Sequence, residues 1–249
     1  MDENLGRVFG DKVQPVANPE QGSPRLWATS DYSQWNIFSH NEKNGKNDDY
    51  FNSMALAYAC ATKKLDVIQL LLERMDVAVD GYFGMVNAPL FAAIDYNSIP
   101  DDQYDVVRLL RKHGAQLYPW KLDKHRPAMS SKLWEFMDPI NSGRSGPEDF
   151  DLVGIPNYLE TSPLSQMSEE ELRRHMDVLA LSYALLSKKP VEATFLLSVR
   201  KVPAQGVGHF IGEPLNAVLR KADTRMMAVA KAYGILPLDG DDPQVPQPA

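Results

Sequence analysis

The sequence predicts an all-α fold, a solenoid of paired short helices, and three observations lead to this prediction. The stretch "LAYACATKKLDVIQLLL" at 56–72 recurs as "LSYALLSKKPVEATFLL" at 181–197, an offset of 125 residues. "PLFAAI" from Pro89 and "PLNAVL" from Pro214 keep the same offset. Apolar residues within 65–72 fall at i, i+3, i+6 and i+7, which is one face of a helix. Two phrases with one offset indicate an internal repeat of helical units.

The N-terminal segment, residues 1–47, is rich in Asn, Gly, Pro, Ser and Asp and is expected to form an irregular cap. The first half of the repeat then covers residues 48–117. Its first two helices are expected over 48–62 and from Leu65 to Arg74, joined by the short polar turn "TKK". Such a connection makes the two helices antiparallel neighbours.

A second pair of helices is expected from Pro89, because proline suits the first turn of a helix. "PLFAAIDY" forms its first helix and "YDVVRLLRKHGAQL" its second. Gly114 stands where a helix ends with a left-handed residue. The Pro-rich region 118–167 that follows is expected to be a loop-rich connection between the halves.

The second half, residues 168–238, opens with a clear helix signal. Ser168 followed by Glu171 matches a capping box, so we expect a helix from 169 to about 187. "PVEATFLLSV", "EPLNAVLRK" and "TRMMAVAKAYG" supply the next three helices, the last ending at Gly234. The tail, 239–249, lacks apolar residues and is expected to be disordered.

The spacing of these units resembles that of ankyrin repeats. Leu56 to Leu90 and Leu181 to Leu215 each span 34 residues, near the ankyrin period of roughly 33. "APLFAAI...DVVRLLRKHGA" from Ala88 resembles the ankyrin pattern, although its inter-helix turn has five extra residues.

The sequence also departs from the ankyrin pattern. The Thr-Pro-Leu-His tetrapeptide is never complete, since Phe91 and Asn216 replace its histidine, and Met75 replaces a terminal glycine. The family resemblance implies degenerate repeats in two duplicated pairs. Another all-helical repeat or bundle is the alternative.

The resemblance further implies that the connections between helix pairs, 80–89 and 205–214, project as β-hairpin fingers. Exposed aromatic, apolar and methionine side chains are typical of interface cores. The candidate partner-binding residues are therefore Tyr82, Phe83, Met85, His209, Phe210 and Ile211. The alternative is that these side chains pack under the neighbouring repeat.

Composition limits the class of partner. A hydrophobic content of 44% is enough to bury a core, and the net charge of −7 argues against a general binder of nucleic acid or of acidic membranes. The charge gives a slight preference for a basic protein partner. The N-terminus lacks the pattern of a secretory signal and no apolar run is long enough to span a membrane, so we expect a cytoplasmic protein.

The sequence contains no G-x-x-x-x-G-K-[ST], H-E-x-x-H or G-x-S-x-G motif, so no catalytic residue, cofactor or metal ligand is predicted. Cys60 falls at a position expected to be core, as do Tyr58 and Tyr183, and the lysine pairs 63–64 and 188–189 are expected to be solvated turn residues. The five histidines are scattered along the chain: His40, His113, His125, His175 and His209.

The sequence thus favours a non-enzymatic protein-interaction module that binds a protein partner through the fingers and the concave face. One form of this hypothesis is an inhibitor or immunity-type protein that masks a toxin or an enzyme. The alternatives are an enzyme or microbial effector with its site in 118–167, where Trp120, His125 and Trp134 are candidates, or a structural subunit of an assembly.

Overall fold

The computed structural model describes residues 47–81, 88–95, 103–115, 155–221 and 223–236, and these contain helices and no strand. The all-α prediction is confirmed for this part of the chain. The helices are α2 (Asn47–Thr62), α3 (Leu65–Glu73), α4 (Ala88–Asp95), α5 (Gln103–Lys112), α8 (Glu169–Leu186), α9 (Pro190–Ser198), α10 (Glu213–Lys221) and α11 (Thr224–Ala232), with the short 3-10 helices η4 (Pro163–Gln166) and η5 (Gly208–Phe210).

Local signals in the sequence account for several helix ends. The Ser168 hydroxyl accepts from the Glu171 amide, and the Glu171 side chain accepts from the Ser168 amide, which confirms the predicted capping box at the start of α8. Gly114 and Gly234 follow α5 and α11 with φ of 87° and 71°. These left-handed conformations favour glycine and end each helix near its predicted residue.

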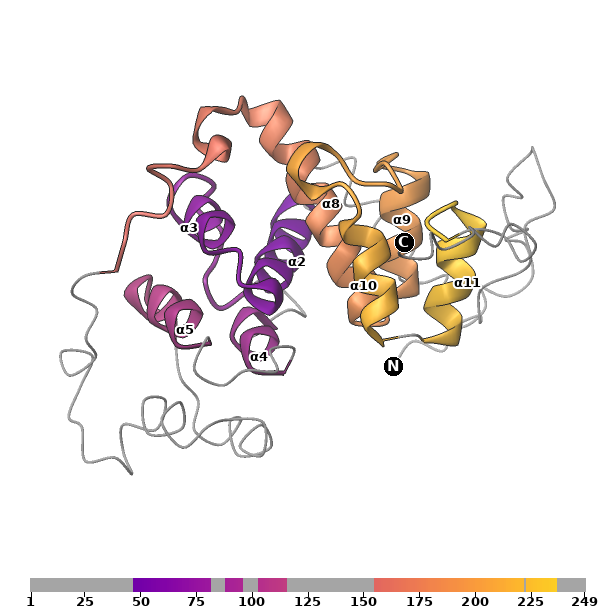
Figure 1. Cartoon of the computed structure of the whole chain (residues 1–249), viewed down its shortest axis with the longest axis horizontal. Coiled ribbons are helices and arrows are strands. Elements are labelled where there is room, and N and C mark those ends of the chain that lie inside the picture. The colour runs from indigo at the N-terminus through magenta and orange to yellow at the C-terminus, as the bar shows by residue number, and fades with distance from the viewer. Residues whose placement is uncertain (1–46, 82–87, 96–102, 116–154, 222, 237–249) are drawn as a thin grey trace, which may run out of the picture.

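Helices α4, α2, α8 and α10 form a row in which each packs against the next. In Figure 1, α3 and α5 lie on the left of this row and α9 and α11 toward its right. Helix α2 packs against α4, α8 and α3, while α8 packs against α2, α10 and α9. The second helix of each pair also contacts its neighbour within the same half, α3 with α5 and α9 with α11. Each half is therefore a compact group of two helix pairs.

The two halves meet through the same helix of the repeat. An offset of 125 residues carries α3 onto α9 and α4 onto α10 and overlaps α2 with α8, while α11 follows α5 at a shorter offset because the turn before α5 has five extra residues. In Figure 1 the equivalent helices lie on opposite sides of a line between α2 and α8. Each half therefore presents its first helix, α2 or α8, to the other half. The helix pairs are consequently not stacked in their chain order.

The core is centred on α2 and α8, which are buried along most of their length. Small residues at 55, 57, 59 and 61 of α2 are fully buried, which allows neighbouring helices to approach closely. The largest fully buried side chains are Tyr58, Phe51, Phe195, Met54, Leu56, Ile68, Leu70, Leu71, Leu109 and Leu110. Since each short helix pair leaves an apolar face that only neighbours cover, the core runs through both halves.

An aromatic and ionic contact also joins the halves. The rings of Phe51 and Phe195 stack with their centroids 5.8 Å apart, and the Arg200 guanidinium lies 4.6 Å from the Phe51 ring centroid. Arg200 donates to Asp48 at 2.6 Å and to Asp177 at 2.8 Å. One cation thus links the start of α2 to α8 and to the end of α9.

The last part of the expected connecting region, residues 155–167, packs on the first half. The Tyr158 amide donates to Gln69 Oε1 at 2.8 Å, and the Ser162 hydroxyl donates to Asp66 Oδ2 at 2.7 Å. Both acceptors lie on α3, so this segment joins α3 to the start of α8. The predictions for 1–46, 116–154 and 237–249 lie outside the described residues.

Candidate functional site

The structure describes half of the predicted partner-binding residues. Tyr82, Phe83 and Met85 lie outside the described part of the chain. In the second connection His209 is exposed, Phe210 is buried and Ile211 is 70% exposed. Only two of these three side chains therefore offer surface to a partner.

Phe210 is a core residue, with 3% of its surface exposed. Its ring meets His175 edge-on at 5.5 Å between centroids, and Lys64 Nζ lies 5.4 Å from its centroid. The structure thus places Phe210 under the neighbouring helices, the alternative that the sequence left open. A partner cannot contact this ring while the connection keeps its present conformation.

The second connection differs from the expected β-hairpin. Between α9 and α10 the described chain contains turns and η5, and no strand. The Gly212 amide donates to the Gln205 carbonyl at 2.8 Å, which closes the loop. Gly206 has φ of 82°, and a Cβ there would lie 2.1 Å from the Phe210 carbonyl oxygen. Backbone packing around Phe210 therefore replaces strand pairing.

Glu213, the first residue of α10, organises the surface beside this connection. Its Oε2 accepts from the Tyr58 hydroxyl at 2.7 Å, and its Oε1 lies 2.6 Å from Lys64 Nζ. The Tyr58 ring is fully buried, and the side chains of Lys64 and Glu213 are 24% and 16% exposed. These bonds hold α10 against the end of α2, which belongs to the other half.

Burial raises the pKa of the Tyr58 hydroxyl far above its usual range, and the hydrogen bond to Glu213 and the Glu213 charge raise it further. The positive charge of nearby Arg220 acts in the opposite direction. The Tyr58 hydroxyl therefore stays protonated at neutral pH and serves as a hydrogen-bond donor. It is poorly suited to act as a general base.

Beside these residues lies an open groove of about 440 Å³, here called the α10 groove. It is lined by Thr62, Lys64, Glu213, Asn216, Leu219 and Arg220. The last three side chains are exposed, and Leu219 is 60% exposed. The groove therefore combines an apolar side chain, an amide and three charges at the junction of α2 and α10.

The sequence placed no functional residue on α10, although its spacing carries a signal. Pro214, Ala217 and Val218 are buried, which leaves Asn216 and Arg220 on the outer face. A helical projection of "EPLNAVLRK" separates these two faces. Glu213 pairs with Tyr58 and Lys64, which lie 155 and 149 positions earlier in the chain, and no local sequence pattern predicts these contacts.

The repeated lysine pairs match the expectation of solvated turns only in part, since Lys188 is exposed but Lys64 and Lys189 are partly buried. Lys63 and Lys188 adopt left-handed φ values of 58° and 60° at the turns that follow α2 and α8. The next residue of each pair is held by a glutamate, Lys64 by Glu213 and Lys189 by Glu192 at 3.4 Å. The repeat thus preserves a turn conformation and uses its second lysine for packing.

Other candidates for chemistry have structural roles. Cys60 is fully buried, and desolvation raises the pKa of its thiol far above the usual range. Its expected place in the core is confirmed. His113 lies beside Glu73, and burial, with a smaller effect of the Lys112 charge, lowers the His113 pKa although Glu73 acts to raise it. Among the described residues, no group of three His, Cys, Asp or Glu side chains is placed to hold a metal ion.

The enzyme alternative rested on Trp120, His125 and Trp134, which lie outside the described residues. No helix in the described part of the chain is both long and apolar enough to cross a membrane. The described helices form two groups of two helix pairs, and the α10 groove lies where the end of α2 in one group meets α10 of the other. Comparison of the chain with protein-family models, curated proteins and solved structures found no match.

Proposed function

We propose that this protein is a non-enzymatic protein-interaction module that binds a protein partner over the α10 groove and the connection before it. The observation that supports this proposal is the exposure of two large apolar side chains beside an open groove. Leu219 is 60% exposed in the groove, and Ile211, 70% exposed, lies two residues before Glu213. Apolar side chains rimmed by polar groups are typical of protein-binding surfaces.

The scaffold beneath this surface favours binding without large rearrangement. Helix α10 packs on α8 through Pro214, Ala217 and Val218, and Glu213 fixes its first turn to α2. A surface held in this way loses little conformational entropy when a partner binds. Helix α10 is therefore a suitable platform for a protein contact.

The helix-pair units support the ankyrin-like part of the proposal, in which repeated pairs form the scaffold and their connections and first helices form the binding surface. The halves meet through α2 and α8, so the scaffold is two short stacks of two pairs placed back to back. In a narrower form of the same proposal, this protein binds a toxin or an enzyme and masks it.

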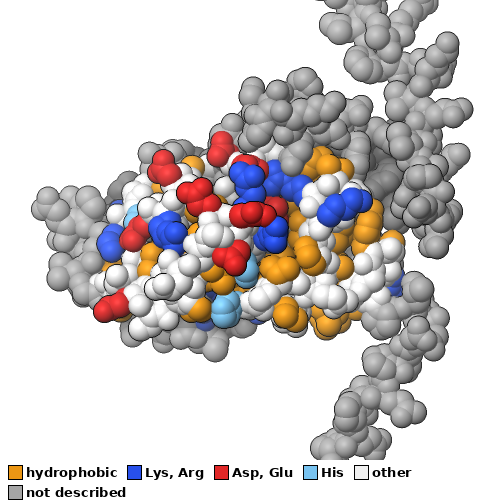
Figure 2. Space-filling model, turned by 90° about the horizontal axis from the view of Figure 1, so that it is seen from above, with side chains coloured by type: hydrophobic (Ala, Val, Ile, Leu, Met, Phe, Trp, Pro, Cys, Tyr) orange, Lys and Arg blue, Asp and Glu red, His pale blue; other side chains and the backbone are white. Residues whose placement is uncertain are grey.

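The distribution of charged side chains over one face of the molecule is consistent with a protein partner. Figure 2 shows basic and acidic side chains interspersed on one face, with hydrophobic side chains gathered toward one end of it. A nucleic-acid binder concentrates Lys and Arg along one face instead. The face seen in Figure 2 lacks such a basic stripe among its described residues.

The test is affinity capture from lysate of the native cells, with the full chain as bait and a Leu219→Asp, Ile211→Asp double variant beside it. We expect a stoichiometric protein with the natural chain and its loss with the double variant. Val199→Asp is the matched control, since Val199 is 43% exposed and lies at the end of α9 outside the groove. Circular dichroism melts must show that all three proteins are equally folded. Equal capture by the double variant would contradict the proposed surface.

A further inference from the structure

The α10 groove indicates which chemistry a partner must present, and this inference rests on the proposed function. We infer that the partner binds through a short segment that places a carboxylate on Arg220 and an apolar side chain on Leu219. Three features of the groove support this inference. Lys64 and Glu213 neutralise each other, Arg220 has no such partner among the described residues, and Leu219 is exposed in the same groove.

Two of the three charged groups in the groove neutralise each other. Lys64 Nζ lies 2.6 Å from Glu213 Oε1, and the other carboxylate oxygen accepts from the Tyr58 hydroxyl at 2.7 Å. Both oxygens of Glu213 therefore have donors from the protein. Its negative charge has a cation in direct contact, so it repels an incoming carboxylate only weakly.

Arg220 supplies the remaining positive charge. Within the described part of the chain, no ion pair or side-chain hydrogen bond engages its guanidinium, and the side chain is exposed. A guanidinium offers paired N–H donors that match the two oxygens of a carboxylate. The groove is therefore locally suited to an acidic group, although the whole chain carries a net charge of −7. The inferred acidic segment thus differs from the slight preference for a basic partner that net charge alone suggests.

Leu219 adds an apolar contact next to that cation. It is 60% exposed, and it lines the same groove as Arg220. The groove of about 440 Å³ holds a few side chains, and its exposed rim suits a segment on a protein surface better than an enclosed small molecule. Asn216, also on the rim, offers an amide that can bond to the peptide backbone of that segment.

The experiment selects a displayed library of random 12-residue peptides on the full-length chain and measures the enriched peptides by fluorescence anisotropy. We expect Asp or Glu within two or three residues of Leu, Ile, Val, Met or Phe. Arg220→Gln should lower the affinity of these peptides about tenfold or more, because a charge-assisted contact is lost. Raising the salt concentration should weaken binding to the natural chain more than binding to Arg220→Gln.

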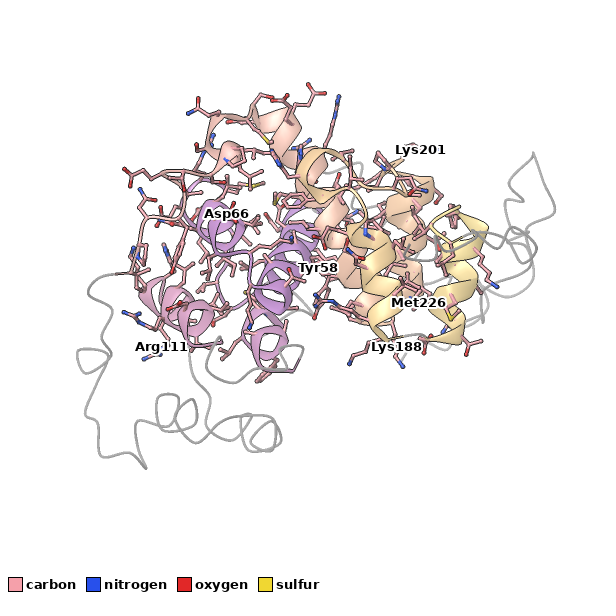
Figure 3. All side chains as sticks on the ribbon, in the orientation of Figure 1. Tyr58, Asp66, Arg111, Lys188, Lys201 and Met226 are labelled. Atoms are coloured by element: carbon pink, nitrogen blue, oxygen red, sulfur yellow. The ribbon has the colours of Figure 1, made fainter. Side chains whose placement is uncertain are left out.

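Two further variants make the test specific. Arg220→Glu should invert the selected charge, so that its enriched peptides carry Lys or Arg in place of the acid. Lys201→Gln is the control for loss of an exposed cation. Figure 3 shows Lys201 well away from Tyr58, and the Tyr58 hydroxyl donates to Glu213 in the groove. This control should bind the selected peptides as the natural chain does.

Enriched peptides without an acid, equal affinity for Arg220→Gln, or no enrichment at all would overturn the inference. The lysate capture experiment tests the proposed function separately from this inference. If lysate capture is lost with the Leu219→Asp, Ile211→Asp double variant but unchanged with Arg220→Gln, the binding surface stands and its acidic specificity is wrong. If the double variant captures the same proteins, the proposed surface itself is wrong.

Discussion

Asp48 and Arg173 occupy equivalent positions in the two halves of the repeat, and their side chains form an ion pair with Nη2 and Oδ2 3.0 Å apart. Residues related by the repeat offset therefore meet directly at the boundary between the halves. Arg200 donates to the other oxygen of the same Asp48. The boundary between the halves therefore contains a small ionic network at the starts of α2 and α8.

Within this network, Arg200 should matter much more for stability than Arg173. The Arg200 side chain is 8% exposed and its loss leaves Asp48 and Asp177 without their shared cation, whereas Arg173 is 67% exposed. We expect Arg200→Met to lower the free energy of unfolding by about 2–4 kcal/mol, a value discounted because both carboxylates are partly solvated. Arg173→Met should cost about 0–1 kcal/mol. Urea unfolding of both variants measures the difference, and equal losses would contradict this account of the interface.

Leu71 and Leu196 test the equivalence of the two halves. Both side chains are fully buried, and they hold the same repeat position in α3 and α9. We expect Leu71→Ala and Leu196→Ala each to destabilise the protein by about 2–5 kcal/mol, since each leaves a cavity in the core. Thermal and urea unfolding give the values. A negligible effect at one position would show that the two helices do not pack alike.

Gly206 and Gly212 form a matched pair in the connection before α10. Their φ values are 82° and 83°, but a Cβ at Gly206 would lie 2.1 Å from the Phe210 carbonyl oxygen, while at Gly212 it would meet no atom within 4 Å. Gly212→Ala should cost about 1–2 kcal/mol from its left-handed backbone alone. Gly206→Ala must cost more, because the loop around Phe210 has to shift as well. Differential scanning calorimetry should show the larger fall in Tm for Gly206→Ala.

Cys60 should be unreactive in the native protein. Its side chain is fully buried, and desolvation holds its pKa far above the usual range, so the reactive thiolate scarcely forms at neutral pH. We expect labelling by a thiol-specific reagent to require unfolding, with a rate that rises together with the unfolded fraction in urea. Rapid labelling without denaturant would show that α2 opens locally in the native state.

Much of the local structure could be predicted because its signals are short in range. The helix starts at Pro190 and at the Ser168 capping box, and the ends at Gly114 and Gly234, depend on residues within one turn of the chain. The apolar spacing of 65–72 placed α3 correctly for the same reason. These features follow from backbone geometry and hydrophobic periodicity, which are visible in a single sequence.

The role of Phe210 could not be predicted, because an aromatic residue in a loop has the same sequence signal whether it is buried or exposed. Its burial depends on contacts with His175 and Lys64, which are far away in the chain. The same limit applies to the α10 groove. Its residues come from α10 and from the end of α2, and only the packed structure brings them together.

The sequence by itself determined where most of the described helices begin and end and which of their faces are apolar. The tertiary structure alone decided that the pairs meet through α2 and α8 rather than in chain order, and that Glu213 is neutralised while Arg220 is left on the surface. The physical reason is the separation along the chain over which each kind of interaction acts. Capping and periodicity act over a few residues, whereas the choice of packing partner depends on which apolar faces bury most completely once the whole chain is folded.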